Sequence, residues 1–223
     1  MTTAVKSVDA YPPQAQEYLR EFGRQIEQAG QVLLDWGSLS TRGQGAYNAG
    51  IRIPGQQAFV LGTFGEAAVV DFDGNVEGEL SRSLREVIAV YTAVFKERDD
   101  LQAVLHTHSP YLTAHAIAHK PFKIQYWSLA KRAGAKEIPL SEWAPRYAPE
   151  PVVQSLRAHP DAPAVLLRNR GLFAWTPHTL LDLAQLLNGL EEGAEIAVYS
   201  ALLGGGKDLP EGALDTFLKQ RKG

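Results

Sequence analysis

The chain contains no cysteine, a single methionine and no excess of charge of one sign. The absence of cysteine excludes disulfide frameworks, thiolate nucleophiles and zinc–thiolate centres. Lysine and arginine number 22 against 25 aspartates and glutamates, and the formal net charge is −3. Nucleic-acid-binding proteins usually carry a basic face, so we expect no nucleic-acid partner. A cytoplasmic location agrees with the absence of cysteine.

Long hydrophobic runs are missing as well. No apolar stretch reaches the roughly 20 residues that a membrane-spanning helix needs. Residues 1–13 contain no apolar segment of the kind found in secretory signals. We therefore expect no membrane association. The 223 residues are enough for a domain with a substantial core.

Apolar residues recur with regular spacing along most of the chain. Spacings of three and four predict helices at 13–35, 83–98, 110–118, 152–158 and 180–203. Short apolar runs predict strands at 51–53, 58–61, 67–72, 101–106, 164–167 and 172–175. The proline-rich stretch 120–150 is predicted to alternate short strands with loops. This order favours an α/β domain in which helices flank a mixed sheet.

We expect one domain at 13–203, preceded by a flexible tail at 1–12 and followed by a tail at 204–223. Three consecutive glycines, 204–206, end the last predicted helix.

The sharpest chemical signal is His106-Thr107-His108 at the end of a predicted buried strand. Residues two apart in a strand point to the same face, so both imidazoles can converge on one ion while Thr107 faces away. Imidazoles are common ligands of zinc, and open α/β sheets bind ligands at the carboxyl ends of strands. Zinc usually takes three or four protein ligands, however. Two structural histidines therefore remain an alternative.

The segment 105–111, Leu-His-Thr-His-Ser-Pro-Tyr, resembles the His-x-His signature of class II aldolases, the superfamily that also contains the adducin head domain. Three other segments, in the family's order, resemble its early glycine-containing loop, its strand–turn–strand and its Leu-x-Asn-His-Gly segment: 36–42, 69–78 and 165–172. The resemblance covers roughly residues 15–203. It implies a three-layer α/β/α fold with a central mixed, mainly antiparallel sheet.

The resemblance also implies a function. Family members are lyases, epimerases or dehydratases of carbohydrate metabolism that act on a small sugar or sugar phosphate. They hold a divalent ion, often zinc, through three histidines, with a carboxylate as ligand or acid–base group. They commonly form homo-oligomers such as tetramers.

When the family's site residues are transferred one by one to this sequence, the metal site is incomplete. His106 and His108 match the first two ligands, whereas the third position holds Arg170, whose guanidinium cannot ligate a metal. The carboxylate position falls on Val87, and Glu86 is the remaining candidate catalytic acid. One helical step turns a side chain by about 100°, so Glu86 reaches the site only if its helix is locally irregular.

An anion-binding function can be predicted for other residues. Gly37 and Ser38 match the early loop, and Asn169 and Arg170 match the later segment. The planar guanidinium of Arg170 suits a phosphate or carboxylate, or could pair with Glu86 instead. Further candidates are weaker: Arg42 and Arg52 for an anion or a salt bridge, and His115 and His119, four apart, for one helix face.

Three readings follow. The first is a divalent-metal-dependent aldehyde-lyase or related enzyme whose missing ligand comes from His115, Glu86 or a neighbouring subunit. The second is a family member that has lost the metal chemistry and binds an anionic ligand through Arg170 and the Gly37 loop, or a protein partner. The third is metal-independent chemistry, such as decarboxylation or dehydration, on the same scaffold.

Overall fold

A seven-stranded sheet forms the centre of the molecule, with strand order β4-β3-β2-β1-β5-β9-β8. The computed structural model describes residues 13–39, 46–145 and 147–215. Neighbouring strands of this sheet all pair antiparallel; they are β1 (Tyr47–Arg52), β2 (Ala58–Thr63), β3 (Glu66–Asp71), β4 (Val76–Glu77), β5 (Ala103–Thr107), β8 (Ala164–Leu166) and β9 (Leu172–Thr176). A separate two-stranded sheet pairs β6 (Phe122–Lys123) with β7 (Glu137–Ile138).

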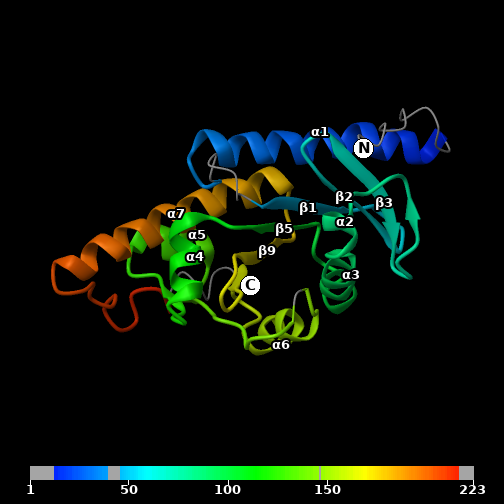
Figure 1. The fold of residues 1–223 in the computed structure, drawn as a ribbon. Coiled ribbons are helices and arrows are strands. Elements are labelled where there is room, and N and C mark those ends of the chain that lie inside the picture. Colours follow the sequence, from blue (N-terminus) through cyan, green and yellow to red (C-terminus); the bar gives the residue numbers. More distant parts are fainter. Residues whose placement is uncertain (1–12, 40–45, 146, 216–223) are drawn as a thin grey trace.

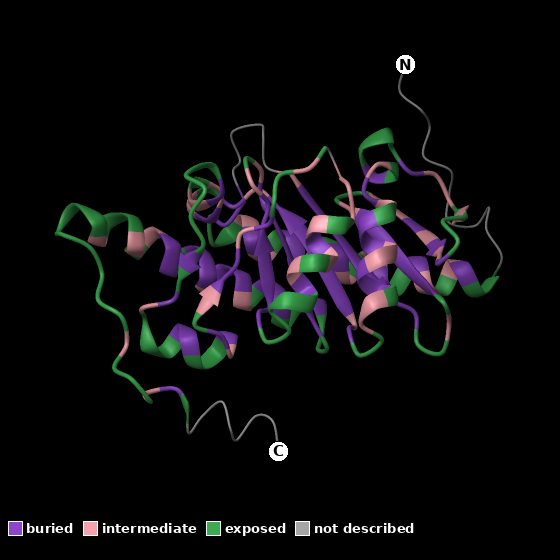
Figure 2. Cartoon of the chain, turned by 90° about the horizontal axis from the view of Figure 1, so that it is seen from below, coloured by how far each residue is buried: buried purple, intermediate pink, exposed green. Residues whose placement is uncertain are grey.

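Helices cover both faces of the large sheet (Figure 1). One face packs against α1 (Pro13–Asp35), α4 (Pro110–Ile117), α5 (Trp127–Ala133) and α7 (Leu180–Leu202). The other packs against α2 (Arg82–Arg85), α3 (Ile88–Glu97) and α6 (Glu150–Ala158). Buried strands lie between partly exposed helices (Figure 2). The predicted α/β/α fold with a mainly antiparallel sheet is confirmed, and its parallel part is an isolated bridge between Leu140 and Leu166.

The central strand β5 is buried along its whole length because each of its faces meets a hydrophobic core. Ala103 and Leu105 pack into the core under α1 and α7, whereas Val104 packs into the core under α3 and α6. Side chains alternate between the faces of a strand, so His106 lies on the same side as Val104. The fold thus places the first histidine of the motif inside the α3–α6 layer.

Two local predictions were wrong. The helix predicted over 83–98 is split into α2 and α3 at Glu86 and Val87, and Val87 is fully buried in the core under α3. The stretch predicted as strands and loops contains helix α5, which Gly134 ends in a left-handed conformation with φ 69°. The buried side of α5 consists of Leu129, Ala130 and Ala133.

The domain core includes Leu214 from the segment that follows α7. Asp208 and Asp215 of that segment form ion pairs with Lys123 and Lys136. The tail predicted at 1–12 lies outside the described residues. None of the helices in the described ranges is long and apolar enough to span a bilayer.

Candidate functional site

His106 lies at the end of β5 and is completely buried. Its Nδ1 is 2.8 Å from the carbonyl oxygen of Leu172 on β9. A carbonyl only accepts hydrogen bonds, so Nδ1 carries the proton and Nε2 keeps a lone pair. That Nε2 is buried and has no hydrogen-bond partner within the described part of the chain. Burial, followed by His108 and the Arg170 guanidinium, lowers the pKa of His106 to about 3, so the ring is neutral near pH 7.

Aromatic rings surround His106 on several sides. The His108 ring meets it edge-on, with centroids 5.1 Å apart, so the structure brings the two histidines of the motif together. Phe173 of β9 stacks against it at 4.7 Å, and Tyr147 approaches edge-on at 5.9 Å. Tyr147 comes from the irregular segment before α6 and has φ 57°. Sequence reasoning missed Tyr147, because that segment carries no periodic pattern.

Arg170 reaches this group from the turn between β8 and β9. The Arg170 guanidinium carbon lies 5.7 Å from the centroid of the Tyr147 ring, which itself contacts His106. Backbone hydrogen bonds close the turn: Leu167 N–H donates to Gly171 at 2.9 Å, and Arg170 N–H donates to Leu167 at 2.8 Å. The segment that replaces the expected third histidine therefore does lie at the motif.

The same turn presses directly on His108. A Cβ atom on Gly171 would lie 1.9 Å from the Thr107 carbonyl oxygen and 2.4 Å from His108 Cδ2. Any residue other than glycine would therefore overlap the backbone of β5.

The other predicted site residues have partners of their own. Glu86, at the end of α2, pairs with Arg82 at 3.3 Å. The buried Ser38 hydroxyl donates to Asn188 Oδ1 of α7 at 2.5 Å, directly after Gly37 with φ 77°. Asn169 Oδ1 lies 2.7 Å from His119 Nε2.

His115 and His119 do not share a helix face as expected, because α4 ends at Ile117. His119 follows the helix in a left-handed conformation with φ 54°, which turns it toward Asn169. The His115 ring instead lies 5.3 Å from that of Phe122. Arg42 lies outside the described residues.

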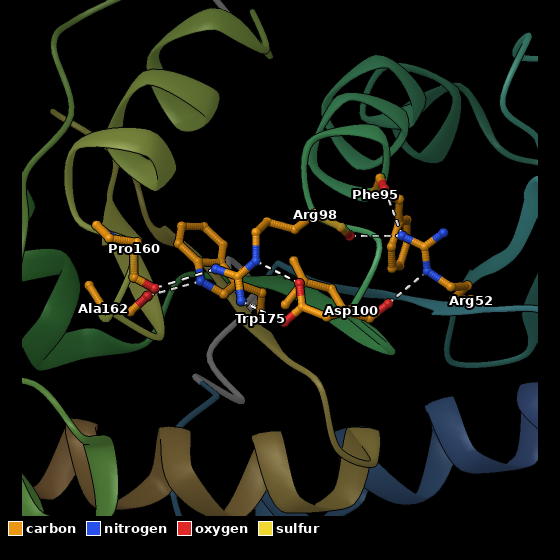
Figure 3. A network of polar contacts seen from close by, with 8 residues as sticks. Arg52, Phe95, Arg98, Asp100, Pro160, Ala162 and Trp175 are labelled. Carbon is orange, nitrogen blue, oxygen red and sulfur yellow. Dashed lines mark hydrogen bonds and ion pairs between the residues drawn. The ribbon is translucent and has the colours of Figure 1, made fainter. Parts of the chain in front are cut away.

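Arg52 has a structural role. The buried guanidinium donates to the carbonyl of Leu101 at 2.7 Å. It also donates to the carbonyls of Phe95 at 2.6 Å and Arg98 at 2.9 Å (Figure 3). Arg98 in turn makes bidentate contacts with Asp100, both at 2.6 Å. These arginines hold the end of β5 that is remote from His106. The sequence left an anion or a salt bridge open for Arg52, and the structure pairs its guanidinium with backbone carbonyls.

The donor set does not match a divalent ion held by three protein ligands. No group of three His, Asp or Glu side chains that could hold a metal occurs in residues 13–39, 46–145 and 147–215. His106 and His108 supply two imidazoles, and the third position supplies a cation. A guanidinium beside a metal would be repelled by it. The arrangement suits a ligand that has a hydroxyl group and a negative charge.

Comparison with known proteins supports the fold. A profile of the family described as "Class II Aldolase and Adducin N-terminal domain" matches residues 17–198. L-Fuculose phosphate aldolase of Escherichia coli O157:H7 is 29% identical over 133 residues, which cover 54% of this chain and 60% of that protein. The protein of the same name from Shigella flexneri matches to the same extent. The match thus spans less than two thirds of these curated relatives.

Solved structures agree over a greater length. An L-fuculose 1-phosphate aldolase superposes with a TM-score of 0.74 at 22% identity, covering 90% of this chain and 95% of that one. The L-fuculose-1-phosphate aldolase from Thermus thermophilus gives a TM-score of 0.64 at 23% identity, covering 83% and 97%. At these identities the likeness shows a common fold.

Proposed function

The chain belongs to the class II aldolase and adducin N-terminal domain family, and from this premise we propose that its site binds a small anionic sugar derivative, such as a sugar phosphate. One observation carries the proposal: the neutral, buried imidazole of His106, with a free lone pair, and the guanidinium of Arg170 both contact the Tyr147 ring, and the Arg170 charge helps to lower the pKa of His106. The relatives named above are aldolases of a sugar phosphate, which is the same chemical class of ligand.

Each group would have a separate task in binding. Arg170 would bind the phosphate or carboxylate oxygens through its planar fork of N–H donors. His106 Nε2 would accept a hydrogen bond from a ligand hydroxyl, which would satisfy a buried ring nitrogen that lacks a partner in the described part of the chain. Tyr147 and His108 would form the sides of the site.

Calorimetric titration with inorganic phosphate and with L-fuculose 1-phosphate tests this proposal. Arg170→Met should weaken binding by about 10- to 100-fold, because a hydrogen bond to a charged group is worth about 1.5–3 kcal/mol. Arg157→Met is the matched control, since Arg157 pairs with Glu97 on the surface. Equal affinities of wild type and Arg170→Met would refute the role of Arg170.

A second candidate is a divalent-metal-dependent aldehyde-lyase, epimerase or dehydratase, with zinc as the ion. The observation in its favour is the Nδ1 contact of His106 with the Leu172 carbonyl, because metal-binding histidines are commonly oriented by such a bond. Glu86 or a residue from a neighbouring subunit, for example in a homotetramer, would then have to complete the ligand set.

Elemental mass spectrometry separates the two candidates. About one zinc ion per chain in wild type, absent in His106→Ala, would support the metal-dependent candidate and overturn the metal-free proposal. Under the metal-free proposal, wild type stays free of zinc after soaking. Arg170→His should then raise zinc affinity, because it restores an imidazole at the third position.

A further inference from the structure

Two buried polar residues stand out on the otherwise apolar inner face of α7. Asn188 and Glu191 are three residues apart, so their side chains share one side of the helix. Their exposed fractions are 7% and 5%. A buried carboxylate is destabilising unless it is hydrogen-bonded, so its partners show what it does.

Glu191 binds the first turn of α4. That helix begins at Pro110, which has no N–H, and the Ser109 side chain makes no capping hydrogen bond. The N–H of Tyr111 donates to Glu191 Oε1 at 2.6 Å, and the N–H of Leu112 donates to Oε2 at 2.9 Å. Glu191 therefore satisfies two N–H groups that the helix itself leaves unbonded.

The capped turn follows directly on the His-x-His motif. Tyr111 is three residues after His108, and Gly171 packs against His108 and Thr107. The backbone between His108 and the first turn of α4 is thus held by the β8–β9 turn at one end and by the Glu191 side chain at the other. Asn188 holds Ser38 of the early loop in the same way, through the 2.5 Å hydrogen bond.

We propose that Glu191 is a positioning residue, which fixes the His108 ring relative to His106 and Arg170 by holding the first turn of α4. The alternative is a helix cap that stabilises α4 and has no effect on the imidazoles. The effect on ligand affinity rests on the proposed function, whereas the effect on the imidazoles does not depend on any ligand.

Nitrogen-15 NMR of the ligand-free protein tests the proposal at the imidazoles. Glu191→Ala should shift the backbone amides of Tyr111 and Leu112 together with the ring nitrogens of His108. Glu191→Gln keeps the length of the side chain and one acceptor oxygen, so it should shift the same amide and imidazole signals by a smaller amount. If Glu191→Ala does not fold, Glu191→Gln alone is used for the test. Glu192→Gln, at the exposed next position, should leave all of these signals unchanged.

Shifted amides with unchanged imidazole signals in both Glu191 variants would show a cap only and overturn the proposal. Titration with inorganic phosphate then extends the test. Residues that orient a binding group typically change affinity by about 10-fold or more, so Glu191→Ala should bind phosphate at least about 10-fold more weakly than Glu192→Gln. If wild type binds no phosphate, the proposed function fails, and the imidazole shifts still decide the role of Glu191.

Discussion

Replacement of Gly171 by alanine should both destabilise the protein and disturb the candidate site. The added Cβ would lie 1.9 Å from the Thr107 carbonyl oxygen, 2.4 Å from His108 Cδ2 and 2.8 Å from the Thr107 carbonyl carbon. Two of these three atoms belong to the backbone of the central sheet. The new methyl group therefore cannot be accommodated by the rotation of one flexible side chain.

The size of the effect follows from the required movement. Because a Cβ is rarely closer than about 3.0 Å to another heavy atom, the β8–β9 turn and the end of β5 must separate by about 1 Å. Overpacking in a rigid core costs about 1–3 kcal/mol, and the upper end applies because the obstacle is backbone. For a domain of this size, about 3 kcal/mol corresponds to a decrease in Tm of roughly 6–12 °C.

Differential scanning calorimetry measures this decrease, and a second glycine provides a matched control. Gly23, within α1, has only the Ala67 Cβ near its own added methyl group, at 3.8 Å. Gly23→Ala should therefore stabilise the protein by up to about 1 kcal/mol, because alanine favours the helix. Opposite signs for the two substitutions are expected. A Tm for Gly171→Ala equal to or above that of wild type would refute the packing described here.

Three further predictions concern stability. Burial raises the pKa of Glu191 to about 7, and Glu195 raises it by a smaller amount, so the folded state favours the protonated carboxyl more than the unfolded state does. The free energy of unfolding should therefore fall by up to about 3 kcal/mol as the pH rises from 4.5 to 7. Urea titrations at several pH values should show this decrease for wild type and not for Glu191→Gln. Arg52→Met leaves two buried carbonyls and one partly buried carbonyl without their donor and should lower the free energy of unfolding, measured by urea denaturation, by at least about 3 kcal/mol, whereas a loss below about 1 kcal/mol would contradict its structural role. Thr179→Ala removes the capping box at the start of α7 and should lower the free energy of unfolding by about 1 kcal/mol with an unchanged m-value, and a changed m-value would mean that more than the cap is lost.

The layers of the fold could be predicted because most of its helices and strands carry strong apolar periodicity. Helix α1 was predicted with its observed bounds, since apolar residues recur along all of its turns. Helix α5 was not, because the four prolines of the stretch 120–150 favoured loops and the helix itself has only three buried residues. Gly134 after two basic residues was a usable signal for the end of that helix.

The site could be predicted only where neighbours in sequence are also neighbours in space. His106 and His108 meet because strand geometry brings residues two apart together. The position of Arg170 was predicted from the order of the segments that resemble the family, and the turn at Gly171 packs against His108 of the His-x-His motif. The contribution of Tyr147 depends on its left-handed backbone in an irregular segment, and no local pattern encodes that. Nor could the cap by Glu191 be predicted, since it joins residues 80 positions apart.

The order of the strands in the large sheet determines when β5 acquires its neighbours during folding. His106 pairs with Asn48 on β1 and with Phe173 on β9, so the central strand acquires its neighbours from distant parts of the sequence on either side. Contacts of such large sequence separation form late and slow folding. Trp175, buried on β9 opposite Val104, can report this closure through its fluorescence. During refolding, local helices should therefore form first, and the pairing of β9 with β5 should coincide with a slow change in Trp175 emission.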